Sequence, residues 1–182
     1  MQLTGTESYL EASPILPPPK DTQPKATQVI PFVVAIDTRE QHPFTFQFAA
    51  VPTRIVTLRT GDYSILGMES LVCVERKSKE DLYGSVTRGR ARFEREMQRM
   101  QHFPRACVVV ESSLEEVRRG MDMSRIDPEV VFHTALSWSG RYHIPWYFVS
   151  TRAEAERLTL TFLRFAWRDF ISQLRPKETP HD

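Results

Sequence analysis

The chain has 182 residues and a mass of 21.1 kDa, which suits one domain with a tail and is long enough to bury a hydrophobic core without disulfides. Apolar residues make up 41% and charged residues 26%, which excludes a collagenous, coiled-coil or wholly disordered chain. The net charge of +1 gives no argument for or against a polyanionic partner, so any such argument must come from local clusters of charge.

Neither a membrane span nor a secretory leader is visible. No run reaches the roughly 18 apolar residues of a span, and the N-terminal segment lacks the basic start and apolar core of a signal peptide. We therefore expect no membrane partner, and a cytoplasmic protein if the gene is bacterial or phage-borne, or a nuclear one if it is eukaryotic. Cys73 and Cys107 each lie in an apolar run, which favours buried thiols over a disulfide or a metal site.

The N-terminal 31 residues differ in composition from the rest. They hold six of the thirteen prolines and few large apolar side chains, so they cannot offset the entropy cost of ordering. We expect residues 1–31 to be a flexible tail, residues 32–175 to form one domain, and residues 176–182 to be a flexible end.

The remaining sequence alternates short apolar runs, which predict strands, with amphipathic stretches, which predict helices. In chain order the expected elements are strands at 32–36, 54–58 and 71–77, helices at 79–83 and 89–102, a strand at 106–111, helices at 114–119 and 128–140, a strand at 144–150, and a long last helix. This alternation predicts an α/β fold with a mixed central sheet flanked by helices.

Helix boundaries carry recognisable capping residues. Ser78, Ser113 and Thr151 can each cap a first turn, and Glu116 and Glu154 complete capping boxes with the last two. Proline at the first helical position and a glycine mark the ends of the helix at 128–140. The apolar positions expected on the last helix include Leu158, Phe162, Phe165, Ala166 and Leu174.

The segment from Asp62 to Lys77 contains the candidate catalytic residues. Because side chains alternate along a strand, Glu75 and Lys77 share one face, whereas Arg76 points to the other. If Asp62, at a strand end or turn, lies beside Glu75, two carboxylates converge next to a lysine. Oxygen ligands of this kind suit Mg²⁺, or Mn²⁺, together with a phosphate. Lys77 could then orient the attacking water or offset charge on the phosphorane-like transition state, which predicts phosphodiester hydrolysis.

Each acidic residue taken alone also has a simpler structural explanation. Asp62 follows a glycine and could be a turn residue, and Asp37 could be a cap or turn residue at the end of its strand. Asp81 stands three residues after Ser78, where it could be part of a helix cap. The five histidines show no spacing typical of a zinc site.

Together, these residues form a known signature. The chain contains Asp37-Thr38-Arg39-Glu40, Gly61-Asp62-Tyr63, Glu75-Arg76-Lys77 followed after three residues by Asp81, and Gly89-Arg90. This set resembles the nuclease domain of the XPF-type structure-specific endonuclease family, over residues 32–150. The resemblance implies a restriction-endonuclease-like fold and metal-dependent cleavage of DNA near branches or junctions between single and double strands, in DNA repair or recombination.

The same resemblance implies roles for individual residues. Asp62 and Glu75 would bind the metal, and Lys77 would lie at the attacking water. Asp37, counted as a further metal ligand, and Asp81 would support the metal site.

Basic residues have implied roles as well. Arg39 and Arg76 would be the basic neighbours of the metal site, with Arg76 counted among the catalytic residues, and Arg90 would lie near the scissile backbone. The segment from Arg76 to Arg105 contains nine Lys or Arg and four Asp or Glu, and this excess of positive charge favours phosphate binding. The expected DNA contacts are Arg39, Arg88, Arg90, Arg92, Arg95 and Arg99.

The sequence also departs from the family pattern. No glycine follows Gly140, so the tandem helix-hairpin-helix module that usually follows this nuclease domain is expected to be absent. Without that module, a homodimer or a separate partner protein could supply part of the DNA grip. The alternative function is a catalytically silent DNA-binding module that positions another nuclease, and a nuclease of the same fold that cuts RNA is a further option.

Overall fold

Six strands form one mixed sheet in the order β2-β1-β3-β4-β5-β6 in the computed structural model, which describes residues 31–122 and 124–174. The strands are β1 (Val34–Asp37), β2 (Thr53–Val56), β3 (Tyr63–Ile65), β4 (Val72–Ser78), β5 (Arg105–Glu111) and β6 (Trp146–Phe148). β3 runs antiparallel to both of its neighbours, whereas the pairs β1–β2, β4–β5 and β5–β6 are parallel. The predicted α/β fold with a mixed sheet is confirmed. The two predicted flexible segments lie outside the described residues, except for Pro31.

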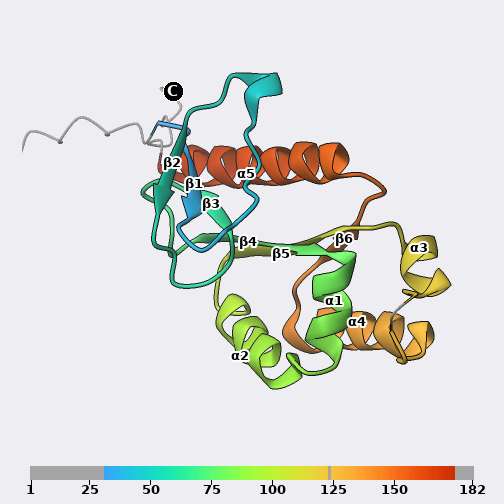
Figure 1. Ribbon diagram of the computed structural model, residues 1–182. Helices are drawn as coiled ribbons and strands as arrows, with labels where there is room; N and C mark the ends of the chain where they lie inside the picture. Colours follow the sequence, from blue (N-terminus) through green and yellow to red (C-terminus); the bar gives the residue numbers. More distant parts are fainter. Residues whose placement is uncertain (1–30, 123, 175–182) are drawn as a thin grey trace, which may run out of the picture.

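Helices cover both faces of the sheet (Figure 1). They are α1 (Lys79–Val86), α2 (Arg90–Met100), α3 (Leu114–Arg119), α4 (Pro128–Tyr142) and α5 (Arg152–Leu174), and a short 3₁₀ turn, η1 (Gln47–Ala49), lies between β1 and β2. Helix α5 lies alone across one face, and α1, α2 and α4 lie on the other, with α3 beside α4. Within the described part of the chain, no helix combines the length and apolar character needed to cross a membrane.

Two hydrophobic cores result, one on each side of the sheet. Val74 and Val109 pack toward α5, whereas Val108 and Val110 pack toward α1, α2 and α4. Because β5 is buried on both faces, its sequence is a continuous apolar run rather than an alternating one. Cys73 and Cys107 are buried and free, as predicted.

The predicted helix caps are present. Ser78 Oγ accepts a hydrogen bond from the Asp81 N–H at 3.1 Å, and Ser113 with Glu116 forms a complete capping box. Thr151 and Glu154 cap α5 in the same reciprocal way. Local sequence therefore sets where these three helices begin.

The structure contains one strand that the sequence did not predict. Strand β3 was not expected, because three residues between two glycine-containing turns give too short a pattern to detect. The strand predicted at 54–58 is β2, and it lies at the edge of the sheet beside β1. One neighbour of β4 is β3, and Asp62 immediately precedes β3.

Two helix predictions were also inexact. Helix α4 continues through Gly140 to Tyr142, whose ring is buried, and His143 ends it with a φ of 54°. On α5, Phe165 and Leu174 are more than half exposed. The helix has more apolar positions than the sheet can cover, and only packing selects the buried ones.

Candidate active site

Asp62, Glu75 and Lys77 come together where β3 begins and β4 ends. Tyr63 pairs with Val74, and the Asp62 N–H donates to the Val74 carbonyl at 2.8 Å. The Arg76 N–H in turn donates to Asp62 Oδ2 at 2.7 Å. The carboxylate of Asp62 is thus held against the backbone of β4, one residue from Glu75.

Gly61 allows this close approach. Its φ of +75° lies in the left-handed region that favours glycine, and a Cβ atom built on it would lie 2.4 Å from Cys73 Sγ and 3.0 Å from the Val74 carbonyl oxygen. No larger residue fits between this turn and β4. The glycine before Asp62 is therefore required by the packing of the turn.

Glu75 and Lys77 share one face of β4, as the strand period predicts. Lys77 Nζ donates to Glu75 Oε1 at 3.1 Å, and both residues are about 6% exposed. Lys77 Nζ also lies 3.9 Å from the centre of the Phe93 ring of α2. The ammonium is held between a carboxylate and an aromatic face.

Burial makes this pair of carboxylates electrostatically costly. Desolvation raises the pKa of Asp62 to about 7, with further contributions from the charges of Glu40 and Glu96. Desolvation, followed by the charge of Asp62, raises the pKa of Glu75 well above its ordinary value, although Lys77 opposes this. The two carboxylates disfavour each other's ionisation, and a divalent cation bound between them would relieve their repulsion.

The donor set fits a hard cation only in part. No set of three or more His, Cys, Asp or Glu side chains among residues 31–122 and 124–174 is arranged to hold a metal ion. Mg²⁺ commonly takes one or two protein carboxylates and fills its remaining positions with water and phosphate oxygens. Asp62 and Glu75 fit that kind of site, in which the substrate supplies further ligands.

Asp37 is adjacent to this pair, but its carboxylate is already used. Oδ1 accepts from the N–H and Nε of Arg39 at 2.8 and 2.6 Å, and Oδ2 accepts from Arg39 Nη2 and the Leu58 N–H at 3.1 and 2.7 Å. Burial raises the pKa of Asp37, but these hydrogen bonds outweigh it and the net pKa is lowered. The Asp37 N–H donates to the Asp62 carbonyl at 2.9 Å. This geometry favours a supporting role for Asp37 over direct metal binding.

Arg76 contributes its backbone to the site, while its side chain lies on the α5 side of β4. The guanidinium makes two hydrogen bonds to Glu111, at 2.7 and 2.9 Å, and two to Glu40, at 3.3 and 3.4 Å. It also lies over the Phe44 ring. Arg152 of α5 also contacts Glu111 and the Phe44 ring. The side chain of Arg76 therefore clamps the segment after β1 to the ends of β4 and β5.

Asp81 has the geometry of a helix cap. Its N–H donates to Ser78 Oγ, and its Oδ2 accepts from the Ser78 hydroxyl, both at 3.1 Å, and the residue is exposed. These contacts match the structural explanation considered for Asp81 from sequence.

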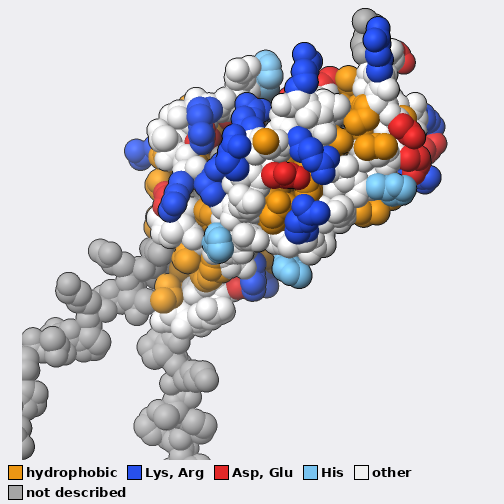
Figure 2. Space-filling view, turned by 90° about the horizontal axis from the view of Figure 1, so that it is seen from below, with side chains coloured by type: hydrophobic (Ala, Val, Ile, Leu, Met, Phe, Trp, Pro, Cys, Tyr) orange, Lys and Arg blue, Asp and Glu red, His pale blue; other side chains and the backbone are white. Residues whose placement is uncertain are grey.

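Most of the predicted DNA-contacting arginines lie on or near α2. Arg39 is bound to Asp37, Arg90 contacts Glu94 and lies over Trp138, and Arg99 Nε reaches Thr60 Oγ1 at 3.4 Å. Arg88, Arg92 and Arg95 are exposed. Figure 2 shows Lys and Arg side chains spread over the face that carries α1, α2 and α4.

Sequence reasoning missed three residues of the site. Glu40 and Glu96 both raise the pKa of Asp62, and Glu96 Oε1 lies 3.4 Å from Thr60 Oγ1. Phe93 and Glu96 lie in the helix predicted at 89–102, and Glu40 lies in the signature segment that begins at Asp37, but none of the three was assigned a role. Nothing local in the sequence links α2 to the turn before β3.

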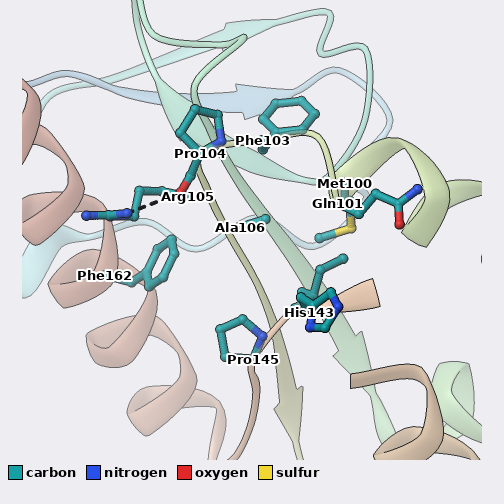
Figure 3. A pocket seen from close by; sticks show the side chains of 10 residues that line it. Met100, Gln101, Phe103, Pro104, Arg105, Ala106, His143, Pro145 and Phe162 are labelled. Carbon is teal, nitrogen blue, oxygen red and sulfur yellow. Dashed lines mark hydrogen bonds between the residues drawn. The ribbon is translucent and has the colours of Figure 1, made fainter. Parts of the chain in front are cut away.

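A separate cavity lies at the start of β5, which runs parallel to β4 and begins at the end of the sheet away from Lys77. Figure 3 shows the side chains that line it. It has a volume of about 230 Å³ and is lined by residues that include Met100, Phe103, Arg105, His143 and Phe162. Arg105 begins β5 and pairs with Asp169 of α5 at 3.1 Å. The carboxylate pair and Lys77 do not line this cavity.

The chain is an α/β protein with a mixed six-stranded sheet between helices, and it carries two carboxylates and a lysine at the junction of β3 and β4. The family model for the ERCC4 domain matches residues 36–162, which is most of the chain. The chain therefore belongs to the ERCC4 domain family.

Solved structures agree on the fold. One described as XPF from Aeropyrum pernix has a TM-score of 0.64 and 18% sequence identity, covering 82% of this chain and 68% of its own. Another, described as XPF from Aeropyrum pernix in complex with DNA, has a TM-score of 0.59 and 18% identity, covering 76% of this chain and 66% of its own. The chain thus spans about two thirds of the length of these proteins. A search of curated protein sequences found no match.

Proposed function

We propose that this chain is a divalent-metal-dependent endonuclease that hydrolyses phosphodiester bonds of DNA at branches or at junctions between single and double strands. The observation that carries the proposal is the convergence of Asp62 and Glu75 beside Lys77. Membership of the ERCC4 domain family supports it. The similar XPF structure in complex with DNA favours DNA as the substrate.

Asp62 and Glu75 are the residues that would hold Mg²⁺ or Mn²⁺. When bound, such an ion supplies Lewis-acid polarisation of the phosphate and offsets its negative charge. The protein contributes a buried donor pair whose mutual repulsion is relieved by a cation. Asp62 is fixed by the Arg76 N–H, so the pair is ordered before substrate binds.

Lys77 acts on the water and the phosphate. Hydrolysis forms a bond from the water oxygen to phosphorus and breaks the bond from phosphorus to a sugar oxygen, so the water loses a proton and the sugar oxygen gains one. The Lys77 ammonium can donate a hydrogen bond that orients the water and can offset charge developing on the phosphoryl oxygens. Its contact with Glu75 keeps it within the site.

The remaining charged residues have supporting roles. Asp37 and Arg39 hold the segment after β1 against the turn that carries Asp62. Arg76 orders the site through its N–H and its contacts on the α5 side of β4. Asp81 fixes the start of α1 directly after Lys77. The DNA backbone would bind across Arg88, Arg90, Arg92, Arg95 and Arg99, and a second copy or a separate partner protein would extend this surface.

The first test is cleavage of end-labelled DNA by the purified chain. Single-stranded, duplex, flap, fork and four-way-junction DNA are compared with Mg²⁺, Mn²⁺ or excess EDTA, beside a flap made of RNA. We expect cutting near the junction of flap or fork DNA that EDTA abolishes. Binding of these substrates without any cutting would instead identify a silent module or a missing partner.

The basic face of α2 makes a second prediction. Arg92→Gln with Arg95→Gln is expected to weaken binding of all DNA substrates. The plot of the logarithm of the binding constant against the logarithm of the salt concentration should become less steep, by about 1 for each phosphate that is no longer neutralised. The measurement is fluorescence anisotropy in Ca²⁺ over a range of salt concentrations. The matched control is Arg118→Gln with Arg119→Gln on α3, whose arginines pair with Glu129 and Glu115. Equal affinities for the two double variants would place the DNA elsewhere.

A further inference from the structure

Phe93 of α2 contacts the ammonium that the proposed function requires. Its ring centre lies 3.9 Å from Lys77 Nζ, well inside the distance of about 6 Å at which a cation interacts with an aromatic face. Phe93 is 2% exposed, so water does not screen the contact. This pairing joins β4 to a helix outside the charged signature.

The ring of Phe93 is itself held in place. It packs edge-on against Trp138 of α4 and Trp146 of β6, at centre-to-centre distances of 5.2 and 5.9 Å. Trp138 is fully buried, and its Nε1 donates to Glu94 on the same helix as Phe93 at 3.1 Å. Three elements therefore fix the orientation of the aromatic face that meets Lys77.

The three N–H groups of the Lys77 ammonium suggest what the contact with Phe93 does. An ammonium has three N–H donors. Glu75 accepts one of them, and the face of Phe93 offers a favourable environment for a second. The third remains for the water or the phosphate, in one direction fixed by the other two.

We propose that Phe93 is a positioning residue that aims the Lys77 ammonium at the reacting water and phosphate. This inference rests on the proposed function, because it assigns Phe93 a role through Lys77. Phe93 does not touch the substrate and its contribution is geometric. Held on one side only, by Glu75, the ammonium would turn toward the carboxylate and lose its alignment.

The kinetic test replaces the ring with side chains of similar bulk. Phe93→Leu and Phe93→Met fill much of the space without an aromatic face. Each is expected to lower kcat for flap DNA by about tenfold and to leave KM nearly unchanged. The affinity for Mn²⁺ alone, measured by calorimetry, is expected to stay the same. The matched control is Phe103→Leu, which alters the same hydrophobic core and is expected to keep kcat.

A spectroscopic test needs no variant to be active. The ring current of Phe93 is expected to shift the Cε protons of Lys77 upfield in the NMR spectrum of the unaltered protein, with the signal assigned by its loss in Lys77→Ala. Phe93→Leu should return that signal toward the position of an exposed lysine. An unshifted Lys77 signal in the unaltered protein overturns the proposal, as does an unchanged kcat in folded Phe93→Leu and Phe93→Met.

The two readouts separate this proposal from the proposed function. If the unaltered chain cuts no DNA but Lys77 shows the ring-current shift, the nuclease assignment fails while the contact stands. If the chain cuts DNA and Lys77→Ala abolishes cutting, but both Phe93 variants retain full kcat, the nuclease assignment stands and the positioning role is wrong.

Discussion

Asp62→Asn is expected to lower the rate of DNA cleavage by about a hundredfold to a thousandfold, the range typical of losing one group that stabilises charge in a transition state. The substitution keeps an oxygen that can accept the Arg76 N–H and so preserves the turn. It removes one of the two charges proposed to hold the metal. Single-turnover cleavage of flap DNA in Mg²⁺ measures the effect, with Asp122→Asn, at an exposed position between α3 and α4, as the control.

The same variant, Asp62→Asn, should be more stable to unfolding although it is less active. In the metal-free protein the pKa of Asp62 is raised from 3.8 to about 7, chiefly by burial. Between these two pKa values the folded state holds a proton on Asp62 that the unfolded chain has lost. The free energy of unfolding therefore falls as the pH rises from 3.8 to about 7. At pH 8 without metal, Asp62→Asn is expected to unfold at a higher urea concentration than the unaltered chain. A loss of both stability and activity would mean that Asp62 is structural.

Arg76→Ala is expected to lower the free energy of unfolding by about 3 kcal/mol, because removing one partner leaves nearly buried carboxylates without their counter-charge. Glu111 and Glu40 are 11% and 7% exposed in their side chains, and Arg152 compensates only at Glu111. Cleavage should fall as well, because the segment after β1 would lose its clamp. Arg76→Lys should restore little, because lysine cannot make the paired contacts to Glu111.

Urea unfolding followed by circular dichroism measures the loss, and Arg105→Ala is the matched control. The ion pair of Arg105 with Asp169 is about half exposed, and such pairs contribute at most about 1 kcal/mol. If Arg76→Ala is as stable as Arg105→Ala but binds DNA more weakly with a smaller salt dependence, then Arg76 contacts phosphate. That result would favour a direct role for Arg76 in DNA binding over the structural role proposed for it here.

The helix-capping pattern and the strand period could be predicted from sequence because both depend on residues close in the chain. Ser113 with Glu116 requires only one turn of helix, and the alternation along β4 is enough to place Glu75 and Lys77 together. The same alternation placed Arg76 on the other face, where its contacts with Glu111 are found.

Only the tertiary structure decided how the site is completed. Asp62 reaches Glu75 through β3, a strand too short to predict, and not through the run at 54–58. Phe93 and Glu96 reach the site because α2 packs across β4 and the turn before β3. Sequence periodicity reports which face of one element is apolar, whereas the pairing of faces from different elements depends on packing over the whole core. The charged residues of the signature were therefore visible in the chain, and their neighbours, partners and orientation were set by the fold.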